Sequence, residues 1–242
     1  MIKIGNNISE FSAYSCQPKS NLELKNIIED RISKEGPNCD LNDIDISLVT
    51  NMSYLFYGSK FNGDISKWDT SKVLYMAYMF AQCDFNGDIS NWDVSKVKDM
   101  SGLFYKSRFT CNLSKWKVSN VENMVSMFRQ SRFNGDISKW NVSKVKNMAY
   151  MFAHSEFDKD ISKWNVSKVT NMPAMFTFSK FNQPIGDWDI HNVDVIDNMF
   201  AYSSFNQDIS KWNLASVGNE NNMTDMFKRC PIKRTFKPIL QK

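Results

Sequence analysis

The stretch FNGDISKW occupies residues 61–68 and returns letter for letter at 133–140. Near-copies lie at 85–92 (FNGDISNW) and 205–212 (FNQDISKW), and the phenylalanine that opens each copy recurs every 24 residues. A fixed period of this length is the signature of a repeat architecture, in which each unit buries its apolar face against its neighbours. This stretch therefore decides the fold, and we number repeat positions from its phenylalanine, position 0, at Phe61.

Other large apolar residues follow the same period. A second phenylalanine column lies at position 19, valine occupies position 12, and methionine fills most of positions 15 and 18. Fifteen of the 18 phenylalanines fall in the two phenylalanine columns, so the large apolar side chains carry the repeat. All seven tryptophans lie at position 7: Trp68, Trp92, Trp116, Trp140, Trp164, Trp188 and Trp212.

The pattern divides the chain into three parts. Repeat units fill residues 37–230 as eight coils, of which the first, 37–60, keeps the apolar register without a tryptophan. Residues 1–36 form an N-terminal segment with a helix expected at about 20–35, capped at its start by Ser20 or Asn21. Residues 231–242 form a basic C-terminal cap or tail.

Both ends of a stack of coils need cover, because each would otherwise expose apolar surface. We expect the apolar face of the N-terminal helix to seal the first coil; the alternative is a docking helix for another protein. The last 15 residues, KRCPIKRTFKPILQK at 228–242, have six basic residues and no acidic one, which also fits a nucleic-acid or membrane tail. Three apolar residues favour end cover: Phe236, Ile239 and Leu240.

Each coil is expected to consist of a short strand, a bend, one or two helical turns and a return. Apolar positions 4, 7, 9 and 12 resemble the strand signature of a leucine-rich repeat, whereas positions 12, 15, 18 and 19 have the spacing of one helical face. The sequence thus predicts an α/β solenoid, a right-handed leucine-rich-repeat-like coil with short parallel strands on one face and short helical turns on the other.

The tryptophan column allows two interpretations. Seven stacked indoles could form a platform for bases or sugars. Polar residues flank each tryptophan on both sides, which favours an inward-facing ladder that contributes to the core. We expect the core ladder and keep the platform as the alternative.

Few residues suggest catalysis or cofactor chemistry. The two histidines, His154 and His191, lie in different columns, and no zinc-type cysteine or histidine spacing or nucleotide-binding loop occurs. The aspartate at position 3 recurs once per coil, interrupted by Asn112 and Pro184, which supplies too few of the 6–8 oxygens that calcium needs. We expect no enzyme, no cofactor and no calcium, and read this aspartate as the acceptor of an Asx turn.

If the tryptophans point inward, positions 6, 8 and 10 point outward. These columns of lysine, aspartate, asparagine and serine form what we call the polar face, and solvation alone is an alternative explanation for them. Its candidate partner-binding residues are Lys67, Asp69, Asn91, Asp93, Lys115, Lys117, Lys139, Asn141, Lys163, Asn165, Asp187, Asp189, His191, Lys211 and Asn213.

Two coils depart from the uniform pattern of the polar face. In 109–132 the usual aspartate or asparagine of position 8 becomes Lys117, and in 181–204 the usual lysine of position 6 becomes Asp187. Because the rest of the face is uniform, these two departures are the positions at which the face could recognise a specific partner.

The pattern MFAxSxFNxDISxWDVSxVxxM, over residues 37–230, resembles the repeat of BspA-type bacterial surface proteins, related to the Treponema type of leucine-rich repeat. The resemblance implies a bacterial origin, a virulence-associated role in attachment or host interaction, and no catalytic residues. It suggests the cell surface or secretion. No signal peptide is visible in the sequence, which also leaves the cytoplasm or a signal-independent route open.

The expected function is a non-enzymatic protein-binding repeat scaffold. The alternatives are a carbohydrate- or matrix-binding adhesin, and a secreted effector or cytoplasmic partner-binding protein. The formal charge of +4 is too mild to favour nucleic acid, and no apolar run is long enough for a membrane span. The partner is expected to be a protein, with a host protein as one option, and the chain a monomer or a weak end-to-end dimer.

Overall fold

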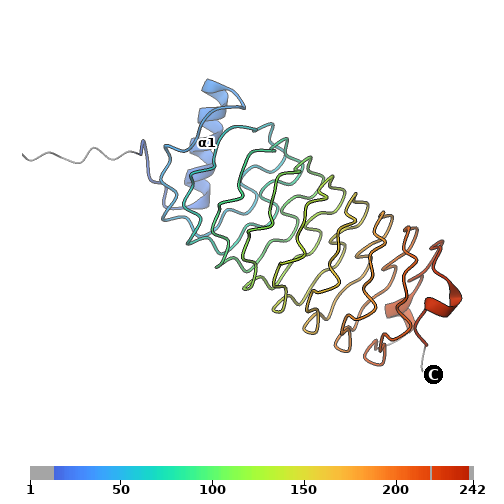
Figure 1. Ribbon diagram of the computed structural model, residues 1–242. Coiled ribbons are helices and arrows are strands. Elements are labelled where there is room, and N and C mark those ends of the chain that lie inside the picture. The colour runs from blue at the N-terminus through green and yellow to red at the C-terminus, as the bar shows by residue number, and fades with distance from the viewer. Residues whose placement is uncertain (1–13, 219, 240–242) are drawn as a thin grey trace, which may run out of the picture.

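The computed structural model describes residues 14–218 and 220–239. Its helical elements are α1 (Asn21–Glu35) and two short 3-10 helices, η1 (Glu220–Met223) and η2 (Arg234–Phe236). After α1 the chain runs in successive coils that lie side by side along one axis, with α1 at the N-terminal end of the row (Figure 1). No helix in this described part is long and apolar enough to cross a membrane.

The coils stack in a parallel register of 24 residues. Single-residue parallel bridges join position 14 of one coil to position 14 of the next, as in Tyr75 with Asp99 and Asn123 with Asn147. We number the coils from the N-terminus, coil 1 to coil 8: 37–60, 61–84, 85–108, 109–132, 133–156, 157–180, 181–204 and 205–230.

The backbone hydrogen bonds between coils do not lie where the strands are expected. They concentrate at positions 13–21, where the N–H groups of Met76, Tyr78 and Phe80 donate to carbonyls of coil 3 at 3.0, 2.7 and 3.0 Å. Positions 4–12 form turns and irregular backbone, and the described residues contain no strand longer than a single bridge. The assignment to a right-handed leucine-rich-repeat-like solenoid stays a prediction.

The helical turns expected at positions 15–19 are absent, and this part of the prediction is wrong. Positions 17 and 21 have a positive φ in all eight coils, from 50° at Arg229 to 67° at Gly58. A left-handed residue ends a right-handed turn. The segment is therefore two successive tight turns, and the N–H groups at positions 15, 17, 19 and 21 reach the next coil instead of their own.

The core is a set of aromatic and aliphatic ladders that run the length of the stack. Both phenylalanine columns are buried apart from Phe227, which is partly buried against the core. Phe56 stacks on Phe61 with ring centroids 4.5 Å apart, and on Phe80 of the next coil at 5.5 Å. Aromatic pairs at these distances add to the free energy gained by burial. Each coil thus depends on its neighbours for its core.

Helix α1 lies where the sequence predicts a helix and covers coil 1. The Ser20 hydroxyl accepts a hydrogen bond from the Glu23 N–H at 3.2 Å, which satisfies one of the free donors of the first turn. Leu24 and Ile28 are 0% and 1% exposed, and Arg31 pairs with Asp43 of coil 1 at 3.0 Å. This end of the stack is therefore closed by both apolar contact and charge.

The C-terminal segment covers coil 8. The Ile209 N–H donates to the Phe236 carbonyl at 3.0 Å, and Ile232 is buried. Ile239 is 82% exposed, so its predicted contribution to the cap is wrong, because its side chain faces solvent and not the apolar end of coil 8. Leu240 lies outside the described residues.

Candidate functional site

The tryptophan column lies inside the molecule. The seven indoles are 3–4% exposed, and Trp140 stacks on Trp164 with centroids 6.5 Å apart. A platform for sugars or bases needs open ring faces, so these residues do not supply one.

Each indole also forms a hydrogen bond that the sequence interpretation did not include. The Nε1–H of each tryptophan donates to the position-4 carbonyl of the preceding coil, as from Trp92 to Ile65 at 3.1 Å and from Trp188 to Ile161 at 3.2 Å. The sequence did contain a sign of this hydrogen bond. Position 7 is always tryptophan and never phenylalanine in coils 2 to 8, and a buried indole N–H needs an acceptor.

The outward columns of the polar face lie where the sequence predicts them. In coils 2 to 8 the residues at positions 6 and 8 are exposed, and the serines at position 10 are half-buried. Position 8 also shapes the backbone: Asp69 and Asn141 accept the N–H of the residue two places on, at 3.0 and 3.1 Å. Hydrogen bonds from the Ser71 hydroxyl and N–H hold the pKa of Asp69 below its ordinary value.

The position-3 aspartates are acceptors in Asx turns. Asp64 and Asp136 accept the N–H of the residue two places on, at 2.8 and 2.9 Å, and Asn112 does the same at 2.8 Å. The N–H and the hydroxyl of Ser66 lower the pKa of Asp64. These carboxylates lie one per coil, and the described residues contain no cluster of three or more potential metal-binding side chains.

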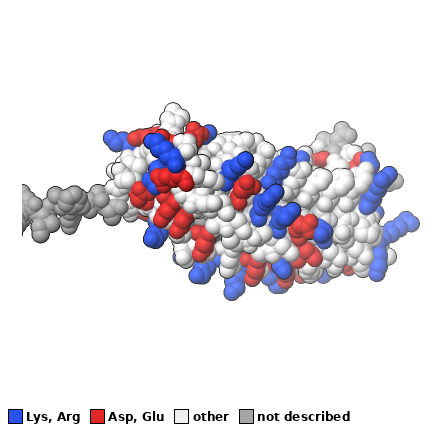
Figure 2. Space-filling view, turned by 90° about the horizontal axis from the view of Figure 1, so that it is seen from above, with Lys and Arg blue, Asp and Glu red and all other residues white. Residues whose placement is uncertain are grey.

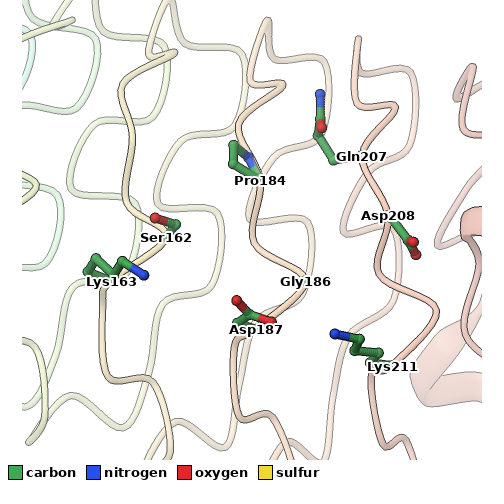
Figure 3. A pocket seen from close by; sticks show the side chains of 8 residues that line it. All are labelled: Ser162, Lys163, Pro184, Gly186, Asp187, Gln207, Asp208 and Lys211. Carbon is green, nitrogen blue, oxygen red and sulfur yellow. The ribbon is translucent and has the colours of Figure 1, made fainter.

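A shallow depression opens on the polar face where coil 7 departs from the repeat. Its volume is about 390 Å³. Figure 3 shows Asp187 between Lys163 of coil 6 and Lys211 of coil 8, with both ammonium groups directed toward the carboxylate. The full lining is Ser162, Lys163, Pro184, Gly186, Asp187, Gln207, Asp208 and Lys211.

Two further substitutions in coil 7 shape this depression. Pro184 replaces the Asx-turn aspartate, and Gly186 replaces the serine found at position 5 in coils 2 to 6 and coil 8, so two polar side chains are missing. A Cβ on Gly186 would lie 2.4 Å from the carbonyl oxygen of Asp208, which requires glycine here. Within the described chain neither flanking lysine forms an ion pair with Asp187, so the three charges are open to a partner.

A second depression, of about 330 Å³, lies between coils 3 and 4 and includes the other departure, Lys117. Hydrogen bonds from the hydroxyl and N–H of Ser95 lower the pKa of Asp93, and the positive charges of Lys117 and Lys96 lower it further. Its lining is Ser90, Asn91, Trp92, Asp93, Val94, Ser95, Lys115 and Lys117.

Other predicted residues of the polar face stand apart from both depressions. Asp189 and His191 bind each other, with Oδ1 and Nδ1 2.6 Å apart, and line neither. Six further exposed residues also line neither depression: Lys67, Asp69, Lys139, Asn141, Asn165 and Asn213. The structure thus brings together two small groups from the predicted face rather than one continuous site.

Comparison with known proteins identifies the family. No curated protein and no solved structure matches this chain. One family model, described as Mycoplasma protein of unknown function, DUF285, matches twice, over residues 24–136 and 130–237. The two matches together run from residue 24 to residue 237 and include all the repeat coils, and the chain therefore belongs to the DUF285 family.

Proposed function

We propose that the chain is a non-enzymatic protein-binding scaffold, a right-handed leucine-rich-repeat-like solenoid that presents its polar face to a protein partner. The observation that carries the proposal is the position of the two depressions. Each one lies where the repeat departs from its uniform pattern, at Lys117 and at Asp187.

The chemistry of the depressions favours a protein partner. Both are open and shallow, and both combine carboxylate and ammonium groups within a few residues. Charges of both signs at fixed spacing distinguish partners by electrostatic complementarity, whereas a small-molecule site is normally more concave and apolar. The buried tryptophans weaken the adhesin alternative that depends on sugar stacking. A role at a bacterial surface or in host interaction rests on the resemblance to BspA-type repeats.

The test uses single charge reversals with a matched control. Lys117→Asp and Asp187→Lys change the two depressions, and Lys139→Asp makes the same change as the first in a uniform coil outside both. Proteins retained from host and bacterial lysates on each immobilised variant are quantified, after circular dichroism has shown that the variants are folded.

A protein retained by the wild type and by Lys139→Asp, and lost with Lys117→Asp or Asp187→Lys, is the expected result. Equal retention by all four proteins, or loss only with Lys139→Asp, would show that the depressions are not the binding site.

A further inference from the structure

A cluster of cations and tyrosines lies on the turn segments at positions 17–21, away from the polar face. The Arg129 guanidinium lies over two rings, 5.8 Å from the centroid of Tyr105 in coil 3 and 5.0 Å from that of Tyr150 in coil 5. The Lys106 ammonium lies 5.3 Å from the Tyr105 centroid. We call these four residues the arginine–tyrosine cluster. Stacking on rings holds a guanidinium in place while its edge remains able to bind an anion.

The cations of this region lack carboxylate partners. Within the described chain no ion pair involves Lys106 or Arg129, nor Arg108 and Arg132 of position 23 in the same two coils. The Nε of Arg129 is buried and has no hydrogen-bond acceptor among the residues that the structure describes.

Two cations of the following coils are neutralised by a neighbouring coil. Lys180, at position 23 of coil 6, pairs with Glu156 of coil 5, and Lys146, at position 13 of coil 5, pairs with Glu122 of coil 4 at 2.7 Å. The balance of charge also changes along the row of coils. On the face seen in Figure 2, acidic side chains gather near the N-terminal end and basic ones are more frequent further along. The four cations of coils 3 and 4 therefore form a local excess of positive charge.

The neighbouring aromatic residues argue against a sugar platform. Tyr54 stacks on Tyr78 at 5.2 Å, and Phe178 lies between His154 at 4.6 Å and Tyr202 at 4.5 Å. Their faces are covered by one another, so they offer edges rather than the open faces that carbohydrate stacking requires.

We infer that the arginine–tyrosine cluster, with Arg108 and Arg132, binds an acidic segment of a protein partner. Arg129 would bind a carboxylate through its planar edge, and the surrounding cations would attract further acidic residues. The tyrosines, at the rim, supply apolar contact for the peptide backbone and for aliphatic side chains. This second surface does not depend on the polar face.

The experiment measures binding of a fluorescent glutamate-rich peptide, by anisotropy, to the full chain at low and physiological salt. Arg129→Gln is expected to weaken binding about tenfold, because one charge-assisted contact is lost. Arg129→Lys keeps the charge but loses the planar edge, and is expected to show an intermediate loss. Arg108→Gln/Arg132→Gln leaves the stacked residues untouched and should also weaken binding, which keeps the test valid if Arg129→Gln misfolds.

The control Lys67→Gln/Lys139→Gln removes the same number of charges from the polar face, outside both depressions, and is expected to bind the peptide as the wild type does. Equal loss in this control would show attraction by net charge alone and would overturn the proposal. Preference for a sulfated polysaccharide over the peptide would overturn it too. Retained binding in Lys117→Asp and Asp187→Lys is expected, and a loss there would assign the peptide to the polar face instead.

Discussion

The indole nitrogen of Trp140 donates a hydrogen bond of 3.0 Å to the backbone carbonyl of Leu113, which belongs to the preceding coil. The acceptor lies 27 residues earlier in the chain, and the same separation is found for all seven tryptophans. Position 7 thus fills the core and ties each coil to the one before it. This bond gives the first prediction.

Replacing Trp140 by Phe should lower the free energy of unfolding by about 2–4 kcal/mol, since the substitution leaves the Leu113 carbonyl buried without its donor and removes core volume. Urea denaturation followed by circular dichroism measures the change. Lys139→Ala, at the exposed neighbouring position, should change it by less than about 0.5 kcal/mol. A similar small effect for Trp140→Phe would mean that the hydrogen bond contributes little.

Gly186→Ala should destabilise the chain by about 1–3 kcal/mol, because the new Cβ would lie 2.4 Å from the Asp208 carbonyl oxygen and coils 7 and 8 would have to separate. Ser162→Ala, at the same repeat position in coil 6, is the matched control and should be nearly neutral. Thermal denaturation compares the two. A tolerated alanine at Gly186 would show that the coils separate here at little cost.

Ala174 adopts a left-handed conformation, with φ of 51°. Ala174→Gly should therefore stabilise the fold by up to about 1 kcal/mol, because glycine has no Cβ to strain in this region. Ala153→Gly, at a buried position without positive φ, should destabilise by about 0.5–1 kcal/mol. Chemical denaturation of both variants checks the opposite signs, and destabilisation by both would contradict the strain argument.

Acid should weaken the Asx turns. The hydroxyl and N–H of Ser138 lower the pKa of Asp136 from its ordinary 3.8. Because the folded pKa is depressed, the stabilisation is complete well above pH 3.8 and is lost as the pH falls through the folded value. Replacing Asp64, Asp88, Asp136, Asp160 and Asp208 by Asn keeps each acceptor oxygen, as Asn112 shows.

The variant with all five Asn substitutions lacks the charge-assisted part of these hydrogen bonds, so it should be less stable than the wild type near pH 7 and should lose stability less steeply below about pH 4. Urea midpoints measured from pH 7 to pH 2.5 test this. An unchanged acid slope would place the acid sensitivity in other carboxylates.

The sequence predicted most features that depend on a period. The columns led by Phe61, Trp68 and Val73 are buried apart from the partly buried Val217, position 6 is exposed in coils 2 to 8, and α1 covers coil 1. These features could be predicted because a residue repeated at a fixed interval has the same environment in every coil. A column of apolar residues therefore indicates the core, and a column of polar residues indicates the surface.

The helical turns were mispredicted because their apolar spacing fits two structures. Met76, Met79 and Phe80 face the core equally well from a helical turn or from two successive tight turns. The two structures differ at Tyr78 and Gln82, which have a left-handed conformation only in the tight turns. Neither residue is a glycine, the residue type that usually indicates this conformation in a sequence.

The amino-acid sequence alone determined the length of the repeat, the columns that form the core and the two coils that break the polar face. Only the tertiary structure decided where backbone hydrogen bonds join the coils, that Gly186 must be glycine, and that Arg129 lies between Tyr105 and Tyr150. The physical reason is that these features depend on contacts between residues about 20 or more positions apart. Such contacts are defined only when one coil rests on the next, and no local pattern of residues encodes them.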